Sequence, residues 1–127
     1  MPNLESNKKS AVAFYEMMFN DCEPERAIET FVGAEYIQHN PHVKSGKRGF
    51  IDYFERMAQE YPGKEVFVKR IVAEGNLVIL HCHQMWPDKL EYAGIDIFRF
   101  DESGKIVEHW DVLQTLSGES ENNNGMF

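Results

Sequence analysis

The spacing of apolar residues changes once along this chain, from a helical period before Glu65 to a strand period after it. Helices are predicted over residues 6–19, 24–32 and 47–61, with a short strand over residues 36–39. Ser6 or Asn7 is the expected cap of the first helix. Alternating residues then predict a meander of four strands over residues 66–73, 77–86, 95–100 and 105–113. This order predicts an α+β domain with helices on one face of a sheet.

Residues 94–114 form the predicted hairpin on which the candidate site depends. Its two arms flank the turn-forming sequence Asp-Glu-Ser-Gly at residues 101–104. Alternation places Asp96 and Phe98 on one face of the first arm, and His109, Asp111 and Leu113 on one face of the second. A four-residue loop would set Asp96 directly opposite His109. A three-residue loop would pair Asp96 with another residue, so the register stays open.

The same reasoning extends to the strand before this hairpin. A four-residue loop after Trp86 would put His81 opposite Asp96 and His83 opposite Gly94. Asp96 would then lie in a row between His81 and His109, with an open space at Gly94. This arrangement depends on two loop lengths that the sequence leaves open.

Composition and charge narrow the range of partners. The net charge of −8 and a pI near 5.1 argue against nucleic acid and acidic membrane surfaces. No apolar leader and no membrane-length apolar stretch is visible, so a cytoplasmic location is expected. One domain is predicted over residues 1–116, and the polar sequence at residues 117–127 predicts a mobile tail. Cys22 and Cys82 form no paired-cysteine motif and are expected to stay reduced.

Three stretches carry a resemblance to a known family: Tyr-Ile-Gln-His-Asn-Pro at residues 36–41, the aromatic helix that follows it, and residues 96–111, which begin with Asp-Ile-Phe-Arg-Phe-Asp and end with Gly-Lys-Ile-Val-Glu-His-Trp-Asp. With them, the chain resembles the SnoaL-like polyketide cyclases of the nuclear-transport-factor-2-like superfamily. The resemblance implies a cone-shaped α+β fold, in which three N-terminal helices pack over one face of a curved mixed sheet around a pocket. It also implies an intramolecular aldol ring closure, with an acidic residue as acid/base and no cofactor.

A second comparison within the superfamily concerns the steroid Δ-isomerases. Tyr15 and Asp96 stand where those enzymes have the two donors to a substrate oxyanion, although Tyr15 could also be ordinary packing. Their general base is an Asp before a Pro, whereas Asn40 precedes Pro41 here, and an amide takes no proton at neutral pH. The resemblance therefore leaves Asp111 as the candidate acid/base, with Asp96 as the alternative.

The remaining candidates would shape the pocket or stabilise enolate charge. They are His109 beside the acids, and the substrate-contacting residues His39, Asn40, His81, His83, Phe98 and Leu113. The leading hypothesis is a cofactor-independent lyase, isomerase or cyclase acting on a small apolar carbonyl compound. The alternative is a domain that binds such a compound without turning it over.

Two further expectations concern metals and partners. The His-Cys-His sequence at residues 81–83 could serve a metal, but no metal-specific motif is present and the resemblance implies metal-free chemistry, so none is predicted. Asp96 and His109 could also be a purely structural pair. The opposite face of the hairpin carries Ile95, Ile97, Trp110 and Val112, and this apolar surface predicts a homodimer.

Overall fold

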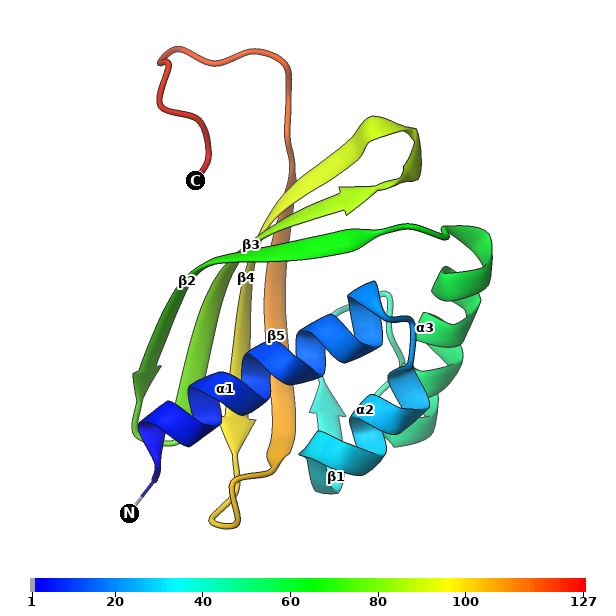
Figure 1. Ribbon diagram of the computed structural model, residues 1–127, viewed down its shortest axis with the longest axis vertical. Coiled ribbons are helices and arrows are strands. Elements are labelled where there is room, and N and C mark those ends of the chain that lie inside the picture. The colour runs from blue at the N-terminus through cyan, green and yellow to red at the C-terminus, as the bar shows by residue number, and fades with distance from the viewer. Residues whose placement is uncertain (1) are drawn as a thin grey trace.

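The computed structural model describes residues 2–127, and its helices lie at the start of the chain (Figure 1). The first, α1 (Leu4–Tyr15), continues as the π-helical turn η1 (Glu16–Asn20), and α2 (Pro24–Phe31) and α3 (Lys47–Glu60) follow. The predicted cap at Ser6 or Asn7 is wrong. Asn3 is the cap, because its side-chain oxygen accepts the backbone N–H of Ser6 at 3.0 Å.

Five strands form one curled sheet beneath these helices (Figure 1). They are β1 (Val32–Gln38), β2 (Glu65–Glu74), β3 (Leu77–Trp86), β4 (Leu90–Phe100) and β5 (Ile106–Thr115), in the spatial order β1-β5-β4-β3-β2. The first strand runs parallel to β5, and the other neighbours are antiparallel. The predicted α+β fold, with a curved mixed sheet and three helices over one face, is therefore confirmed.

The register between β4 and β5 differs from the predicted one by two residues. Asp96 lies opposite Asp111, and His109 lies opposite Phe98. A longer turn and a bulge between Arg99 and Phe100 cause this shift. A shift of two residues leaves every side chain on its predicted face, so the acids and His109 still share the inner face.

The register between β3 and β4 differs by one residue, and this error changes faces. The turn η2 (Pro87–Lys89) has three residues, made possible by left-handed backbone at Asp88 and Lys89, so Trp86 pairs with Leu90. His81 is therefore opposite Ile95 and His83 opposite Ala93, on the outer face. The predicted row of His81, Asp96 and His109 is wrong for this reason.

The space expected at Gly94 is also absent. Gly94 lies between Cys82 and Leu113, and a Cβ added to it would approach a methyl carbon of Leu113 within 2.8 Å. The side chain of Leu113 therefore occupies this position.

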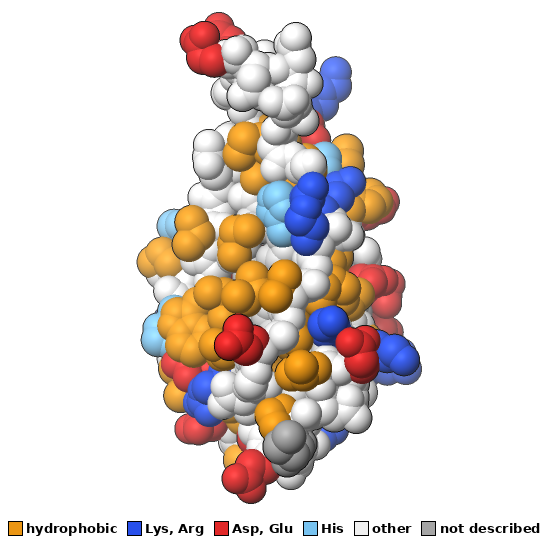
Figure 2. Space-filling view, turned by 90° about the vertical axis from the view of Figure 1, so that its left-hand side faces the viewer, with side chains coloured by type: hydrophobic (Ala, Val, Ile, Leu, Met, Phe, Trp, Pro, Cys, Tyr) orange, Lys and Arg blue, Asp and Glu red, His pale blue; other side chains and the backbone are white. Residues whose placement is uncertain are grey.

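The inner and outer faces of the sheet have different roles. Inner-face side chains pack with α1 and the other helices in an aromatic core that includes Phe14, Phe19, Phe50 and Phe98, all at most 1% exposed. Hydrophobic side chains also gather on the outer face, which Figure 2 shows, and among them Phe67, Ile95 and Val112 are 40–72% exposed. The outer face therefore exposes several large apolar side chains to solvent in the single chain.

Residues 117–127 contain no helix or strand and fold back toward β2 and β3 (Figure 1). The ring of Phe127 stacks on His83 with 4.4 Å between centroids, and Arg70 donates a hydrogen bond to the Phe127 backbone oxygen at 3.2 Å. The mobility of this tail stays a prediction. Within residues 2–127, no helix has the length and hydropathy needed to cross a membrane.

Candidate active site

An inner cavity lies between the sheet, α1 and α3. It has a volume of about 50 Å³, and half of the residues that line it are aromatic, with polar side chains contributed mainly by the strands. A wider vestibule of about 590 Å³ adjoins it. The two spaces share six lining residues, which are Asn40, Tyr53, Gln84, Trp86, Asp111 and Leu113. The site is therefore a small closed end beneath a broad mouth.

Asp96 and His109 form the polar base of the inner cavity. Asp96 on β4 is 1% exposed and His109 on β5 is 7% exposed. They are diagonal neighbours across the two strands, a separation that long side chains can bridge. His109 Nε2 lies 2.9 Å from Asp96 Oδ1. The predicted contact between these residues thus exists, although they are not directly opposite.

Gln38 fixes which nitrogen of His109 carries a proton. Gln38 Oε1 accepts the backbone N–H groups of His39 and Asn40, each at 3.1 Å, and so must be the amide oxygen. The same oxygen lies 2.9 Å from His109 Nδ1, which must therefore donate. The remaining nitrogen, Nε2, can hydrogen-bond with Asp96 only if one proton lies between them. The pair accordingly holds a shared proton, either on the imidazole or on the carboxyl.

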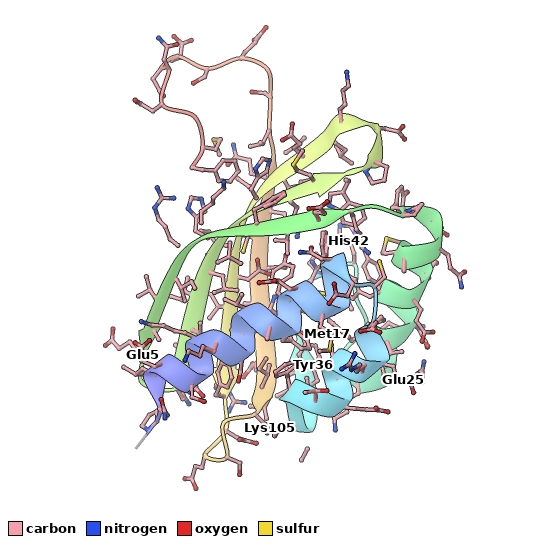
Figure 3. The ribbon with its side chains drawn as sticks, in the orientation of Figure 1. Glu5, Met17, Glu25, Tyr36, His42 and Lys105 are labelled. Atoms are coloured by element: carbon pink, nitrogen blue, oxygen red, sulfur yellow. The ribbon has the colours of Figure 1, made fainter. Side chains whose placement is uncertain are left out.

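The electrostatics of Asp96 are unusual for a carboxyl. Burial raises its pKa above the ordinary value, the nearby charge of Asp111 raises it further, and His109 acts in the opposite direction. Its second oxygen, Oδ2, is buried without a hydrogen-bond partner in the described part of the chain, and the same is true of the Tyr36 hydroxyl. Both residues line the inner cavity, and Tyr36 extends from β1 into the space under the helices (Figure 3). An acceptor and a donor are therefore available to a ligand.

Asp111 and Asn40 lie at the boundary between the inner cavity and the vestibule. Asn40 Oδ1 accepts the backbone N–H of His42 at 2.9 Å, which turns Asn40 Nδ2 toward Asp111 Oδ2 at 3.0 Å. Asp111 is half-buried, whereas Asp96 is fully buried. The two acids thus differ in depth and in hydrogen-bond partners.

The structure brings together most of the predicted site residues. Tyr15, Asn40, Asp96, Phe98, His109, Asp111 and Leu113 all line the inner cavity. His39 does not, because its ring stacks on Trp110 at 4.9 Å and pairs with Glu108 at 2.7 Å on the outer side. His81 and His83 also lie on the outer face, where they contact Arg70 and Glu91 respectively.

Sequence reasoning missed Tyr36, Gln38 and Gln84. Tyr36 and Gln38 alternate on β1 and therefore share a face, a signal that was present in the sequence. Gln84 shares the inner face with Leu80 and Cys82, and the one-residue register error hid it.

The site could also hold a cation. Asp96, His109 and Asp111 each offer one ligand atom, and the three atoms lie within 4.8 Å of one another. A carboxylate–histidine–carboxylate set is a familiar ligand combination for divalent metals. Gln38 would orient the histidine as an outer-shell partner. The expectation that the site works without a metal stays a prediction.

Fold and site together define a class: a curled α+β cone of the nuclear-transport-factor-2-like fold that encloses an apolar cavity, with one acid at its base and a second near its mouth. The sequence profile of the SnoaL-like domain matches residues 11–109. The chain belongs to the SnoaL-like family.

Solved structures agree on the fold. A candidate polyketide cyclase from Acidithiobacillus ferrooxidans has a TM-score of 0.75 at 14% identity, covering 89% of this chain and 91% of that one. An LEH-like epoxide hydrolase from M. tuberculosis has a TM-score of 0.74 at 20% identity, covering 89% and 86%. A candidate ketosteroid isomerase from Kribbella flavida has a TM-score of 0.72 at 12% identity, covering 98% and 89%. A search of curated proteins found no match.

Proposed function

We propose that this protein is a cofactor-independent acid/base catalyst that moves a proton next to the carbonyl group of a small apolar compound, in an isomerase, lyase or cyclase reaction. The observation that carries the proposal is that Asp96 Oδ2 is buried in the inner cavity and has no hydrogen-bond partner among the described residues. A carboxyl with a raised pKa is suited to exchanging protons near neutral pH.

In the proposed reaction, Asp96 Oδ2 removes the proton from the carbon next to the carbonyl. The charge that develops on the carbonyl oxygen accepts hydrogen bonds from hydroxyl groups in the cavity, for which Tyr15 and Tyr36 are available. His109 keeps Asp96 in place and shares its proton. Aldol closure, isomerisation and elimination can each begin from the resulting enolate.

Asp96 is favoured over Asp111 as the acid/base, in reverse of the order suggested by the sequence. Asp111 is less buried and is held by Asn40 at the mouth, where a hydrogen bond to the ligand is the simpler role. The volumes of the inner cavity and the vestibule suggest a substrate with a small reacting end and a larger body. Only its reacting end fits in about 50 Å³, and its apolar body would occupy the vestibule.

The test is the exchange of α-protons for deuterium in bicyclic ketones such as 2-tetralone and 1-indanone, followed by NMR. Wild-type protein is expected to accelerate exchange above the buffer rate, and Asp96→Asn should lower the catalysed rate by about 10²–10⁴-fold. Asp111→Asn should have a smaller effect. His81→Gln on the outer face is the matched control, and this variant should catalyse ketone exchange at the wild-type rate. If Asp96→Asn protein catalysed exchange at the wild-type rate, the acid/base role assigned to Asp96 would be contradicted.

A ligand-binding domain without catalysis is the second candidate, because unpartnered polar atoms at the base of an apolar cavity also suit a ligand that is only held. This candidate predicts that the same ketones bind, as seen by shifts of aromatic resonances, while their α-protons exchange at the buffer rate. The exchange assay therefore separates the two functions.

A homodimer through the outer sheet face is also proposed. Ile95 and Val112 are directly opposite each other on this face and are 40% and 72% exposed. Light scattering of wild-type protein should give the mass of two chains, and Ile95→Asp should give the mass of one. Leu4→Asp, which adds the same charge on α1, should leave the mass unchanged. A single-chain mass for the wild type would contradict the dimer.

A further inference from the structure

Trp86, Gln84 and Tyr15 form a hydrogen-bond chain whose direction is determined by chemistry. The indole N–H of Trp86 can only donate, and it lies 2.9 Å from Gln84 Oε1. The other end of the Gln84 amide is consequently the nitrogen, which donates to the hydroxyl oxygen of Tyr15. The chain runs from Trp86 through Gln84 to Tyr15, and it cannot run in reverse.

This direction decides where the Tyr15 proton points. The hydroxyl oxygen accepts from Gln84, so its own proton is free for a different partner. Tyr15 is 2% exposed and lines the inner cavity, where Asp96 Oδ2 has no hydrogen-bond partner in residues 2–127. Burial raises the pKa of Tyr15 well above its ordinary value, and the charge of Asp96 raises it further, so the hydroxyl keeps its proton.

We propose that Gln84 and Trp86 are positioning residues that direct the Tyr15 hydroxyl proton into the inner cavity, toward the reacting oxygen of the substrate. The inference rests on the proposed function, since it assigns the donor to the same carbonyl. It also restricts the substrate class: the atom that reaches Tyr15 must be an acceptor, such as a ketone, enolate or phenolate oxygen. Gln84 is 4% exposed, so water does not substitute readily for its amide.

Gln84→Glu tests the direction of the chain at nearly constant size. An ionised carboxyl accepts hydrogen bonds only, so it would take both the Trp86 N–H and the Tyr15 O–H, and the tyrosine proton would turn away from the cavity. Ketone exchange is expected to fall about 10²-fold, to the level of Tyr15→Phe. Lowering the pH should restore part of the rate, because a protonated carboxyl can donate to Tyr15 as the amide does.

A double-mutant cycle separates positioning from general damage. If Gln84 acts through Tyr15, Gln84→Glu should cause no further loss in a Tyr15→Phe background. Trp86→Phe keeps the ring but removes the indole donor, and it should give a smaller loss that also vanishes in that background. This second variant keeps the test available if Gln84→Glu does not fold. Losses that multiply in the double variants would overturn the inference.

The outcome can be distinguished from failure of the proposed function. Suppose that exchange requires Asp96 while the losses of rate in the double variants multiply. In that case the positioning role of Gln84 and Trp86 is wrong and the proposed function stands. If wild-type protein catalyses no exchange, the same cycle is measured with the dissociation constant of 4-nitrophenolate, whose oxygen accepts the same hydrogen bond without reacting. If Gln84→Glu, Tyr15→Phe and the double variant all weaken the binding of 4-nitrophenolate by the same factor, the result supports the positioning role. Unchanged affinity in Gln84→Glu, or no binding by wild-type protein, overturns it.

Discussion

Two histidine–carboxylate pairs on the same sheet have similar geometry and different surroundings. On the inner face, His109 Nε2 lies 2.9 Å from Asp96 Oδ1, and the two side chains are 9% and 2% exposed. On the outer face, His83 Nε2 lies 2.6 Å from Glu91 Oε1, and these side chains are 17% and 36% exposed. The outer pair is the shorter of the two, yet solvent can stabilise its charges.

The difference shows that burial, and not contact distance, makes a pair chemically unusual. Water around Glu91 screens its charge, and such surface pairs contribute little to the free energy of folding. Asp96 has no such screening, and burial raises its pKa. A histidine and a carboxylic acid therefore form a surface contact on one face of the sheet and a candidate proton-transfer pair on the other.

The largest expected effect of this contrast is on stability. Phe98 is 1% exposed on the inner face and contacts the rings of Phe14, Tyr15 and His109. Phe98→Ala should lower the free energy of unfolding by about 3–5 kcal/mol, because it leaves a cavity in the aromatic core. Val72→Ala, at a 59% exposed position on the outer face of β2, is the control and should change it by less than about 0.5 kcal/mol. Urea denaturation measures both, and similar values for the two would contradict the assignment of faces.

The assignment of faces is also where sequence reasoning succeeded and failed. For β4 and β5 the predicted register was wrong by two residues, and every inner residue kept its side, so Asp96 and His109 were correctly brought together. For β3 an error of one residue moved His81 and His83 out of the site and concealed Gln84. The cause was local. Asp88 and Lys89 both adopt left-handed backbone although neither is glycine, and nothing in the surrounding sequence predicts this.

The existence of the helices and strands was predictable, because the periodic spacing of their apolar residues extends over many positions. Burial depth was not, since it depends on how α1 and β1 close over the sheet. The sequence thus placed Asp96 and Asp111 on one face without separating the buried acid from the half-buried one. The roles of Gln38 and Gln84 in setting proton positions could not be predicted, because they depend on contacts between strands and with α1.

A smaller effect is expected from Asp96→Asn, and it should depend on pH. The folded-state pKa of Asp96 is raised, so its contribution to stability is fully present below the unfolded-state pKa and is lost as pH rises through the folded-state value. Asparagine does not ionise and avoids this loss. Near neutral pH the variant should be more stable than wild type by on the order of 1 kcal/mol.

Urea denaturation between pH 4 and pH 8 measures this gap, which should widen as pH rises. Glu91→Gln on the outer face is the matched control and should show no such widening in favour of the variant. A constant gap would mean that folding leaves the pKa of Asp96 unchanged. A gap that favours wild type more at higher pH would mean that the fold stabilises the Asp96 carboxylate. Either result would contradict the raised pKa.

The smallest effect is expected at Glu108 on the outer side, and its pH dependence should have the opposite sign. The hydrogen bond from His39, followed by the one from Arg99, lowers the pKa of Glu108 below its ordinary value. Its contribution is therefore present above the unfolded-state pKa and is lost as pH falls through the folded-state value. Glu108→Gln should cost about 0.5–1 kcal/mol at neutral pH, less in high salt, and nothing in acid. Urea denaturation at two salt concentrations checks this, and a cost independent of salt and pH would indicate lost packing instead of lost charge.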